Sequence, residues 1–124
     1  NVRPPIRLDA TAPETWPVGR AQALLCINMV HISPWAATLG LFSGAAKCLP
    51  PEAPLVLYGP YLEAGVETAP SNLAFDADLR ARNADWGLRW RHEVEAVALA
   101  AGFQPGARHM LPANNLLLLF RRKG

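Results

Sequence analysis

The sequence has few of the residues and patterns that mark several protein classes. Its two cysteines, Cys26 and Cys48, form no CxxC pair and no Cys/His cluster with metal-ligand spacing. We therefore expect reduced thiols, no metal site and a cytoplasmic location. No apolar run approaches the roughly 18 to 20 residues that span a bilayer, which argues against a membrane partner. The formal net charge is only +2 and the arginines are spread along the chain, so the charge does not indicate a nucleic-acid partner.

The composition is that of one folded domain. Hydrophobic residues make up 51% of the 124 residues and charged residues 18%, which is enough apolar material to bury a core. The chain begins at Asn1 without an initiator methionine. We therefore expect that a segment precedes it in the intact protein.

Three stretches in the first half of the chain indicate strands. Ile6 to Asp9 alternates behind two prolines, and because proline cannot donate to a ladder, this pattern predicts an edge strand. Ala23 to Val30 (ALLCINMV) is almost continuously apolar, which favours a central strand covered on both faces. Leu55 to Tyr58 predicts a further strand, which a Gly-Pro pair ends.

Three stretches predict helices. Ser33 is placed to cap a helix that has Pro34 at its first position and ends before Pro50. Asn72 to Arg82 carries acid–base pairs at four-residue spacing, which stabilise a helix. Glu93 to Ala101 is followed by a glycine, a usual residue at a helix C-terminus.

Two strands are predicted at the end of the chain. Ala107 to Leu111 and Leu116 to Arg121 are joined by a short link, whose length favours an antiparallel hairpin. The whole order is strand, strand, helix, strand, helix, helix, strand, strand. This order predicts an α/β fold with a parallel portion and a terminal antiparallel pair.

Four local sequences resemble one small family of class I S-adenosylmethionine-dependent methyltransferases, the poorly characterised methyltransferase-like proteins of bacteria and animals. The matching stretches are Cys26 to Trp35 (CINMVHISPW), Leu57 to Tyr61 (LYGPY), Ser71 to Arg82 (SNLAFDADLRAR) and Pro112 to Arg121 (PANNLLLLFR). They keep the family's order and cover most of the chain. The resemblance implies a Rossmann-like α/β sheet, S-adenosylmethionine as cofactor and methyl transfer as activity.

The resemblance also implies which part of a methyltransferase the chain represents. It places Ile6 to Asp9 on the third strand of the family's sheet and Ala23 to Val30 on the fourth. Residues 1–124 are then the C-terminal part of one domain, without its first two strands and its glycine-rich cofactor loop, because no GxGxG-type sequence occurs. We expect about 70 to 100 further residues before Asn1, from typical α/β unit sizes. Alone, the chain is expected to be inactive and to self-associate through its unpaired strand edge.

Three residues are predicted to bind the cofactor: Asp9, Asn28 and Met29. By the resemblance, the carboxylate of Asp9 would accept a hydrogen bond from the adenine amino group. The alternative is a solvated aspartate at a strand end. Asn28 and Met29 lie near the end of the predicted fourth strand, where polar groups must find partners or face a cleft. There Asn28 would reach the methionine portion of the cofactor.

The acceptor side of the same cleft has four further candidates. His31 would serve as a catalytic base, because an imidazole with an ordinary pKa near 6.5 can take a proton from an acceptor hydroxyl. An equal alternative is that it only bonds backbone where the strand ends. Tyr58 and Tyr61 are predicted to bind substrate, with ordinary packing as the alternative. Asn72 lies on a segment that resembles the family's acceptor lid and is also predicted to bind substrate.

Several neighbouring residues are expected to have structural roles. Phe75 and Leu79, four residues apart, are predicted core residues of the helix at Asn72 to Arg82. Asn114 and Asn115 are predicted turn residues, because asparagine tolerates left-handed backbone.

The predicted class of acceptor rests on a comparison with the enzymes that methylate DNA bases. The segment from Asn28 onward departs from the Asn-Pro-Pro-aromatic motif of enzymes that methylate amino groups of DNA bases. A small-molecule acceptor is therefore preferred. Two other functions remain open: a non-catalytic scaffold or interaction protein with the methyltransferase fold, and another α/β nucleotide-binding enzyme such as a dehydrogenase.

Overall fold

A four-stranded mixed sheet organises the computed structural model, which describes residues 2–124. The sheet has the order β1-β2-β4-β3. Its strands are β1 (Leu24–Ile27), β2 (Pro54–Gly59), β3 (Phe103–Leu111) and β4 (Asn115–Arg122). β1 pairs parallel with β2, whereas β4 pairs antiparallel with both β2 and β3. The predicted α/β architecture and its terminal antiparallel hairpin are confirmed.

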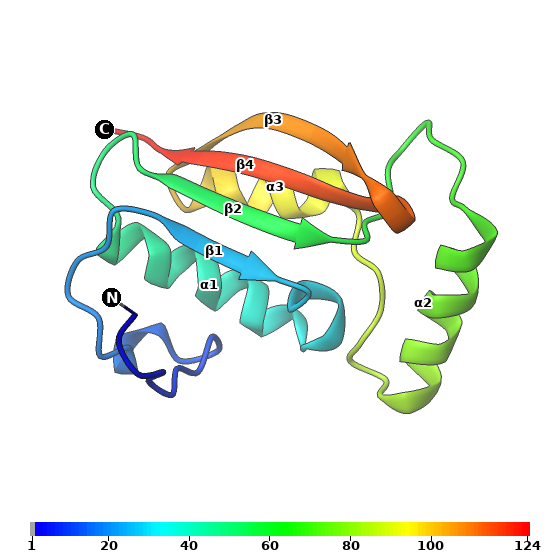
Figure 1. The fold of residues 1–124 in the computed structure, drawn as a ribbon, viewed down its shortest axis with the longest axis horizontal. Helices are drawn as coiled ribbons and strands as arrows, with labels where there is room; N and C mark the ends of the chain where they lie inside the picture. Colours follow the sequence, from blue (N-terminus) through cyan, green and yellow to red (C-terminus); the bar gives the residue numbers. More distant parts are fainter. Residues whose placement is uncertain (1) are drawn as a thin grey trace.

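Two of the three helices cover one face of this sheet (Figure 1). They are α1 (Trp35–Cys48), which joins β1 to β2, and α3 (Arg91–Ala100), which leads into β3. α2 (Pro70–Arg82) stands beyond the ends of the strands. Short 3₁₀ turns lie at Pro13–Thr15 (η1), Val30–Ile32 (η2) and Pro112–Asn114 (η3). No helix within residues 2–124 has the length and apolar character to cross a membrane.

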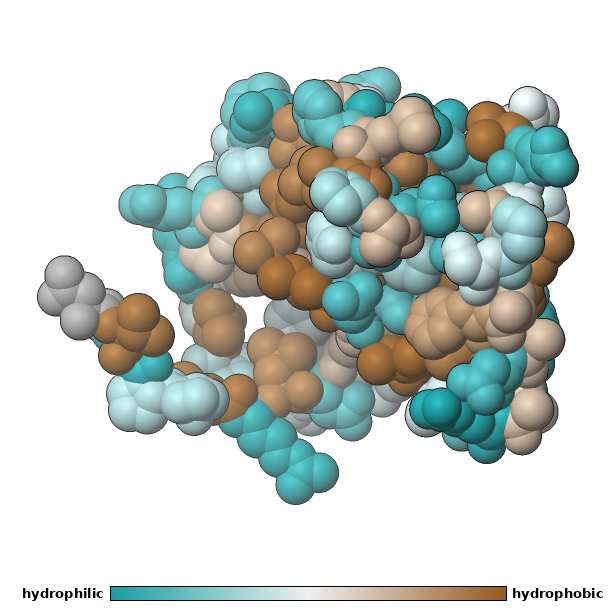
Figure 2. Space-filling view, turned by 45° about the vertical axis from the view of Figure 1, so that its right-hand side comes forward, coloured by the Kyte–Doolittle hydropathy of each residue, from teal (hydrophilic) through white to brown (hydrophobic). Residues whose placement is uncertain are grey.

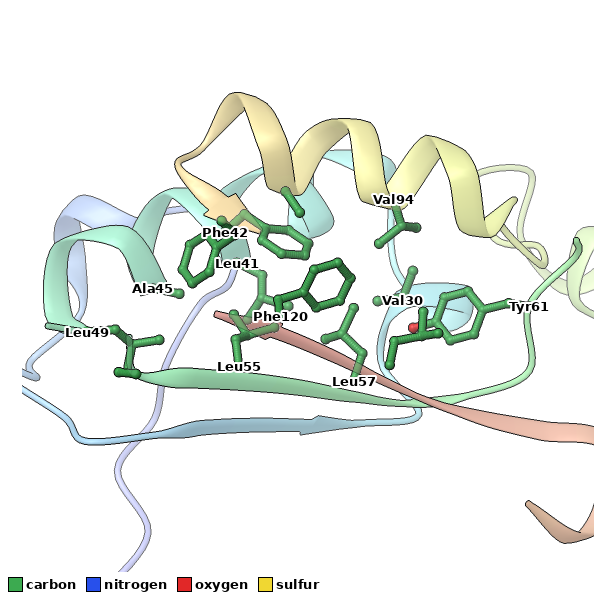
Figure 3. Close-up of a cluster of buried hydrophobic side chains, with 14 of the residues drawn as sticks. Val30, Leu41, Phe42, Ala45, Leu49, Leu55, Leu57, Tyr61, Val94 and Phe120 are labelled. Carbon is green, nitrogen blue, oxygen red and sulfur yellow. The ribbon is translucent and has the colours of Figure 1, made fainter. Parts of the chain in front are cut away.

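The core lies between the sheet and the two helices, and Figure 3 shows Phe42 and Phe120 among its side chains. Phe42 of α1 packs edge-to-face against Phe103 and Phe120, with ring centroids 5.6 and 5.3 Å apart. Leu55 and Leu57 of β2 are fully buried in the same cluster. Because alternate residues of β2 enter this core, a slip of one residue would expose them, and the register is thereby fixed.

The strand predicted from Ala23 to Val30 is shorter than expected and is covered on one face only. It is limited to Leu24–Ile27 at the edge of the sheet, and Leu25 and Ile27 are 62% and 56% exposed on the open face. The apolar run is continuous for another reason: the chain leaves the sheet after Ile27, and Val30 turns into the core. Self-association through this unpaired edge stays a prediction.

The edge strand predicted at Ile6 to Asp9 is wrong. This segment pairs with no strand of the described chain. Asp9 instead begins a turn, in which its carboxylate accepts from the Thr11 amide at 2.9 Å and its carbonyl from Trp16 Nε1 at 2.7 Å. The first described residues project from the body of the molecule at the left of Figure 2, and Val2 is 97% exposed. Alternation alone cannot make a strand without a neighbour to pair with.

The predicted cap of α1 is also wrong in detail. Ser33 Oγ donates back to the Met29 carbonyl at 2.7 Å and caps no helical amide. Pro34 is the residue before the helix, which begins at Trp35. The remaining predicted helices and strands are present, with shifted ends.

Two glycines on α1 leave room for the N-terminal segment to pack against the helix. A side chain on Gly40 would overlap the carbonyl oxygen of Ala10, and one on Gly44 would overlap the Trp16 ring. Glycine is therefore required here by close approach. Its role at both positions is to let residues 10–16 lie directly on α1.

We predict that Gly44→Ala destabilises the intact protein by about 1 to 3 kcal/mol, the usual range for overpacking. The added methyl group must displace either Trp16 or the helix. The measurement is the urea midpoint of unfolding, with Gly19→Ala as the control, because a side chain on Gly19 would meet no atom within 4 Å. An unchanged midpoint for Gly44→Ala would show that Trp16 does not rest on α1.

Candidate functional site

The topology brings four chain segments to the same end of the strands. The parallel strands β1 and β2 both terminate there. β3 also terminates there and β4 begins there, because these two strands are antiparallel. Asn28, Pro60 and the η3 turn therefore lie at the same end of the strands, and α2 stands beyond them (Figure 1). Ligands of open α/β sheets bind at the carboxyl ends of parallel strands.

An open cleft of about 750 Å³ lies at this end of the strands. That volume is in the range of small-molecule sites. The lining residues come from the turn after β1, from the start of the β2–α2 loop, from α2 and the loop after it, and from η3. They are Asn28, His31, Ile32, Pro60, Ser71, Asn72, Phe75, Leu79, Arg82, Trp86, Ala113, Asn114 and Asn115.

Asn28 follows β1 and has a left-handed conformation, with a φ of 52°. Its amide donates to the Tyr58 carbonyl at 2.8 Å, which extends the parallel ladder beyond the strand. Asparagine tolerates this backbone better than most residues. A methyl group on Gly59 would lie 3.4 Å from both Asn28 Oδ1 and His31 Cε1. The side chains of Asn28 and His31 therefore both lie close to Gly59.

His31 is held in the η2 turn and is only 5% exposed. Its ring packs edge-to-face on Phe75, with centroids 5.6 Å apart, and its carbonyl accepts from the Gly87 amide at 3.0 Å. Burial lowers the pKa of His31 below the ordinary value of 6.5. The imidazole is therefore neutral at pH 7 and can accept a proton.

α2 is attached to the rest of the molecule by few groups. Among its residues only Leu79 is buried. Asp76 accepts from the Leu88 amide at 2.8 Å, which ties the helix to the loop that follows it. Within the helix Asp76 also accepts from Arg80 Nε at 3.1 Å. Phe75 is 38% exposed and lines the cleft, so the prediction that it belongs to the core is wrong. Leu79 is a core residue as predicted.

A smaller cavity of about 150 Å³ adjoins the cleft, because Asn72, Asn114 and Asn115 line both spaces. Glu63, 8% exposed, lies in its wall. The Glu63 carboxylate accepts from Arg108 Nε at 2.6 Å and pairs with Arg91 Nε at 2.9 Å. The hydrogen bond from Arg108 holds the pKa of Glu63 below its usual range. This buried ion pair fixes the β2–α2 loop against β3 and α3.

Three of the predicted site residues lie in the cleft: Asn28, His31 and Asn72. The structure does not bring Asp9, Met29 or Tyr58 into its lining. Met29 is half-buried against the core, where its sulfur lies 3.1 Å from Ser33 Oγ.

Tyr58, also half-buried, lies on the open face of the sheet in register with Ile27. Asp9 belongs to the turn near α1 described above. The side chain of Tyr61 is a core residue that only borders the small cavity. It is 7% exposed, and Figure 3 shows its oxygen on the Val30 side of the ring.

The sequence did not predict several residues that line the cleft. They include Ile32, Arg82 and Ala113, and Asn114 was assigned to a turn. Asn114 was the one available signal, because a turn that joins two antiparallel strands must lie at one end of those strands. No local pattern tells which of the two ends carries the cleft.

Solved structures share this fold at low sequence identity. An O-methyltransferase family protein from Burkholderia thailandensis matches 96% of the chain with a TM-score of 0.79 and 14% identity, and the match covers 35% of that protein. Human N-acetylserotonin methyltransferase, solved in complex with S-adenosylmethionine, matches 90% of the chain with a TM-score of 0.78 and 12% identity, over 32% of its own length. A protein described as a pericyclic reaction enzyme matches 87% with a TM-score of 0.73 and 16% identity, over 28% of its length.

These likenesses establish the fold. The chain has the architecture of the C-terminal part of S-adenosylmethionine-dependent methyltransferases and spans about a third of the length of the solved structures it matches. The fold alone does not fix the reaction, since the pericyclic enzyme shares it. A family model described as "Protein of unknown function (DUF938)" matches residues 1–122, and the chain belongs to that family.

Proposed function

We propose that the intact protein transfers the methyl group of S-adenosylmethionine to an oxygen or nitrogen nucleophile of a small molecule bound in the cleft. The observation that carries this proposal is that the side chains of Asn28 and His31 both lie close to Gly59 at the carboxyl ends of β1 and β2. The methyltransferases that share the fold support it. Their substrates are their own and identify no acceptor for this chain.

The residues present fit one end of the proposed cofactor. The Asn28 side chain is exposed at the cleft and hydrogen-bonds no residue within 2–124, so its amide and carbonyl are free for the amino and carboxylate groups of a methionine moiety. When bound, S-adenosylmethionine supplies a methyl group already activated on a sulfonium. Roles for Asp9 toward the adenine and for Met29 stay predictions.

The acceptor would lie against the apolar wall made by Phe75 and Trp86. Binding in that position would supply much of the rate acceleration of methyl transfer. Alignment of the acceptor with the cofactor converts a bimolecular step into a unimolecular one. His31 would accept the proton that the nucleophile loses, since its buried imidazole is neutral at pH 7. Asn72 faces the same cleft and would orient the acceptor.

We predict that Asn28→Gly and His31→Ala separate binding from turnover. Asn28→Gly keeps the left-handed backbone and should raise the cofactor Kd about five- to tenfold, the effect of one or two hydrogen bonds. His31→Ala should leave that Kd nearly unchanged and lower kcat about a hundredfold, as expected for the loss of a general base. Calorimetry and single-turnover kinetics measure the two effects.

Asn83→Ala is the control for these variants, because the Asn83 carboxamide binds the Asp85 amide outside the cleft. It should change neither constant. Equal cofactor affinity for wild type and Asn28→Gly would refute the assignment of Asn28. Unchanged turnover in His31→Ala would remove the base.

A second prediction concerns pH and stability. Because the folded pKa of His31 lies below 6.5, the unfolded chain binds a proton between these two values that the folded chain does not. The free energy of unfolding should therefore be at its full value above pH 6.5 and fall as the pH drops below it. His31→Gln should flatten this loss between about pH 7.5 and about pH 5.5 in urea titrations. His109→Gln, which alters an exposed histidine of β3, should retain it; equal slopes in the two variants would contradict the burial of His31.

A further inference from the structure

Asparagine side chains separate the cleft from the small cavity beside it. Asn72 of α2 and Asn114 and Asn115 at the β3–β4 link line both spaces. Asn72 Nδ2 donates to the Asn114 carbonyl at 3.3 Å, and Asn114 Nδ2 donates to Ser71 Oγ at 3.4 Å. Both bonds are long and solvent-exposed, so they are weak. A ligand that offers better partners can replace them.

The backbone of this turn is unusual. Ala113 and Asn114 have φ values of 62° and 59°, and Asn28 across the cleft has 52°. These are three of the four non-glycine residues with positive φ within residues 2–124. Alanine has no polar side chain to compensate for this conformation. Strained backbone of this kind concentrates at ligand sites, because the surrounding structure must maintain it.

The charged groups around the asparagines are paired or exposed. Arg108 in the small cavity is neutralised by Glu63, and Arg82 in the cleft pairs with Asp78 at 3.1 Å. Glu67 is exposed at the border of the cavity and would repel an anion. The groups that remain free to hydrogen-bond a ligand between the cleft and the small cavity are therefore neutral carboxamides, which both donate and accept.

We propose that Asn72 and Asn114 determine acceptor specificity by binding an uncharged hydrogen-bonding group at the far end of the acceptor. A primary carboxamide is the simplest such group. It inserts between the two side chains and replaces the bonds that Asn72 Nδ2 makes to the Asn114 carbonyl and that Asn114 Nδ2 makes to Ser71 Oγ. The apolar body of the acceptor then lies against Phe75 and Trp86. The proposal rests on the proposed function, of which it names the substrate class.

The test uses four para-substituted phenols of nearly equal shape. 4-Hydroxybenzamide carries the neutral amide, 4-hydroxybenzoate an anion, 4-hydroxybenzylamine a cation and 4-methylphenol no polar group. Dissociation constants are measured on the intact protein by NMR titration, with the side-chain amide signals of asparagine as reporters. The benzamide should bind about tenfold more tightly than the other three, the effect of one or two hydrogen bonds.

Variants locate the effect. Asn72→Ala and Asn114→Gly, the latter compatible with the left-handed backbone, should each abolish the advantage of the benzamide. Leu73→Ala alters a neighbouring residue that is 55% exposed and lines neither space, and it should retain that advantage. Tighter binding of a charged probe, an advantage that survives in both asparagine variants, or failure of all four probes to bind would overturn the proposal.

Binding and catalysis fail separately in this design. Selective binding of the benzamide without methyl transfer to any phenol would leave the recognition intact and refute the proposed function. Methyl transfer that is indifferent to Asn72 and Asn114 would leave the function intact and refute the recognition.

Discussion

The parallel pairing of β1 with β2 is the constraint on which the site depends. Leu24 and Cys26 of β1 lie in register with Leu55 and Leu57 of β2, which the core buries completely. This register makes both strands end at the same edge. The bond from the Asn28 amide to β2 is the last of the ladder, and the chain then turns away in a left-handed conformation. A shift of this pairing would move the whole η2 turn away from Gly59.

The turn after β1 places one apolar and one ionisable side chain out of water. Val30 is 3% exposed in the core, and His31 is 5% exposed beside Phe75. Burial of a valine contributes about 1.5 to 3 kcal/mol, which offsets the cost of keeping a neutral imidazole from solvent. The same geometry lowers the pKa of His31 and gives it the protonation state of a base. Structure and proposed chemistry are thus coupled through one short turn.

The opposite wall of the cleft is held less firmly. α2 buries only Leu79, and its N-terminal end is joined to η3 by weak hydrogen bonds of asparagine side chains. The loop before it is fixed more strongly, because the buried carboxylate of Glu63 binds two arginines. Removal of one partner of such a pair is costly, since a buried charge is left without compensation. The cleft therefore has one wall held by the parallel ladder and one wall held by few contacts.

Local patterns predicted most elements, and contacts between distant residues explain what they missed. The prolines at its two ends identified α1, and the charge pairs at four-residue spacing identified α2, because these signals lie within or beside the segment itself. The pattern at Ile6 to Asp9 misled, since strand formation requires a partner that the pattern does not contain. Phe75 has the spacing of a core residue, but spacing along a helix does not tell whether its neighbour is a core or a cleft. The bond between Asn72 and Asn114 joins residues 42 positions apart, and no local signal encodes it.

The central proposal is that S-adenosylmethionine binds with its sulfur where β1 and β2 end. The direct test is a crystal of the intact protein with the selenium analogue of S-adenosylhomocysteine, in which anomalous scattering locates the single heavy atom. The account predicts one selenium peak in the cleft beside Asn28 and His31, within reach of an acceptor packed on Phe75. A peak on the open face of the sheet, along α3, or anywhere outside this cleft would contradict it.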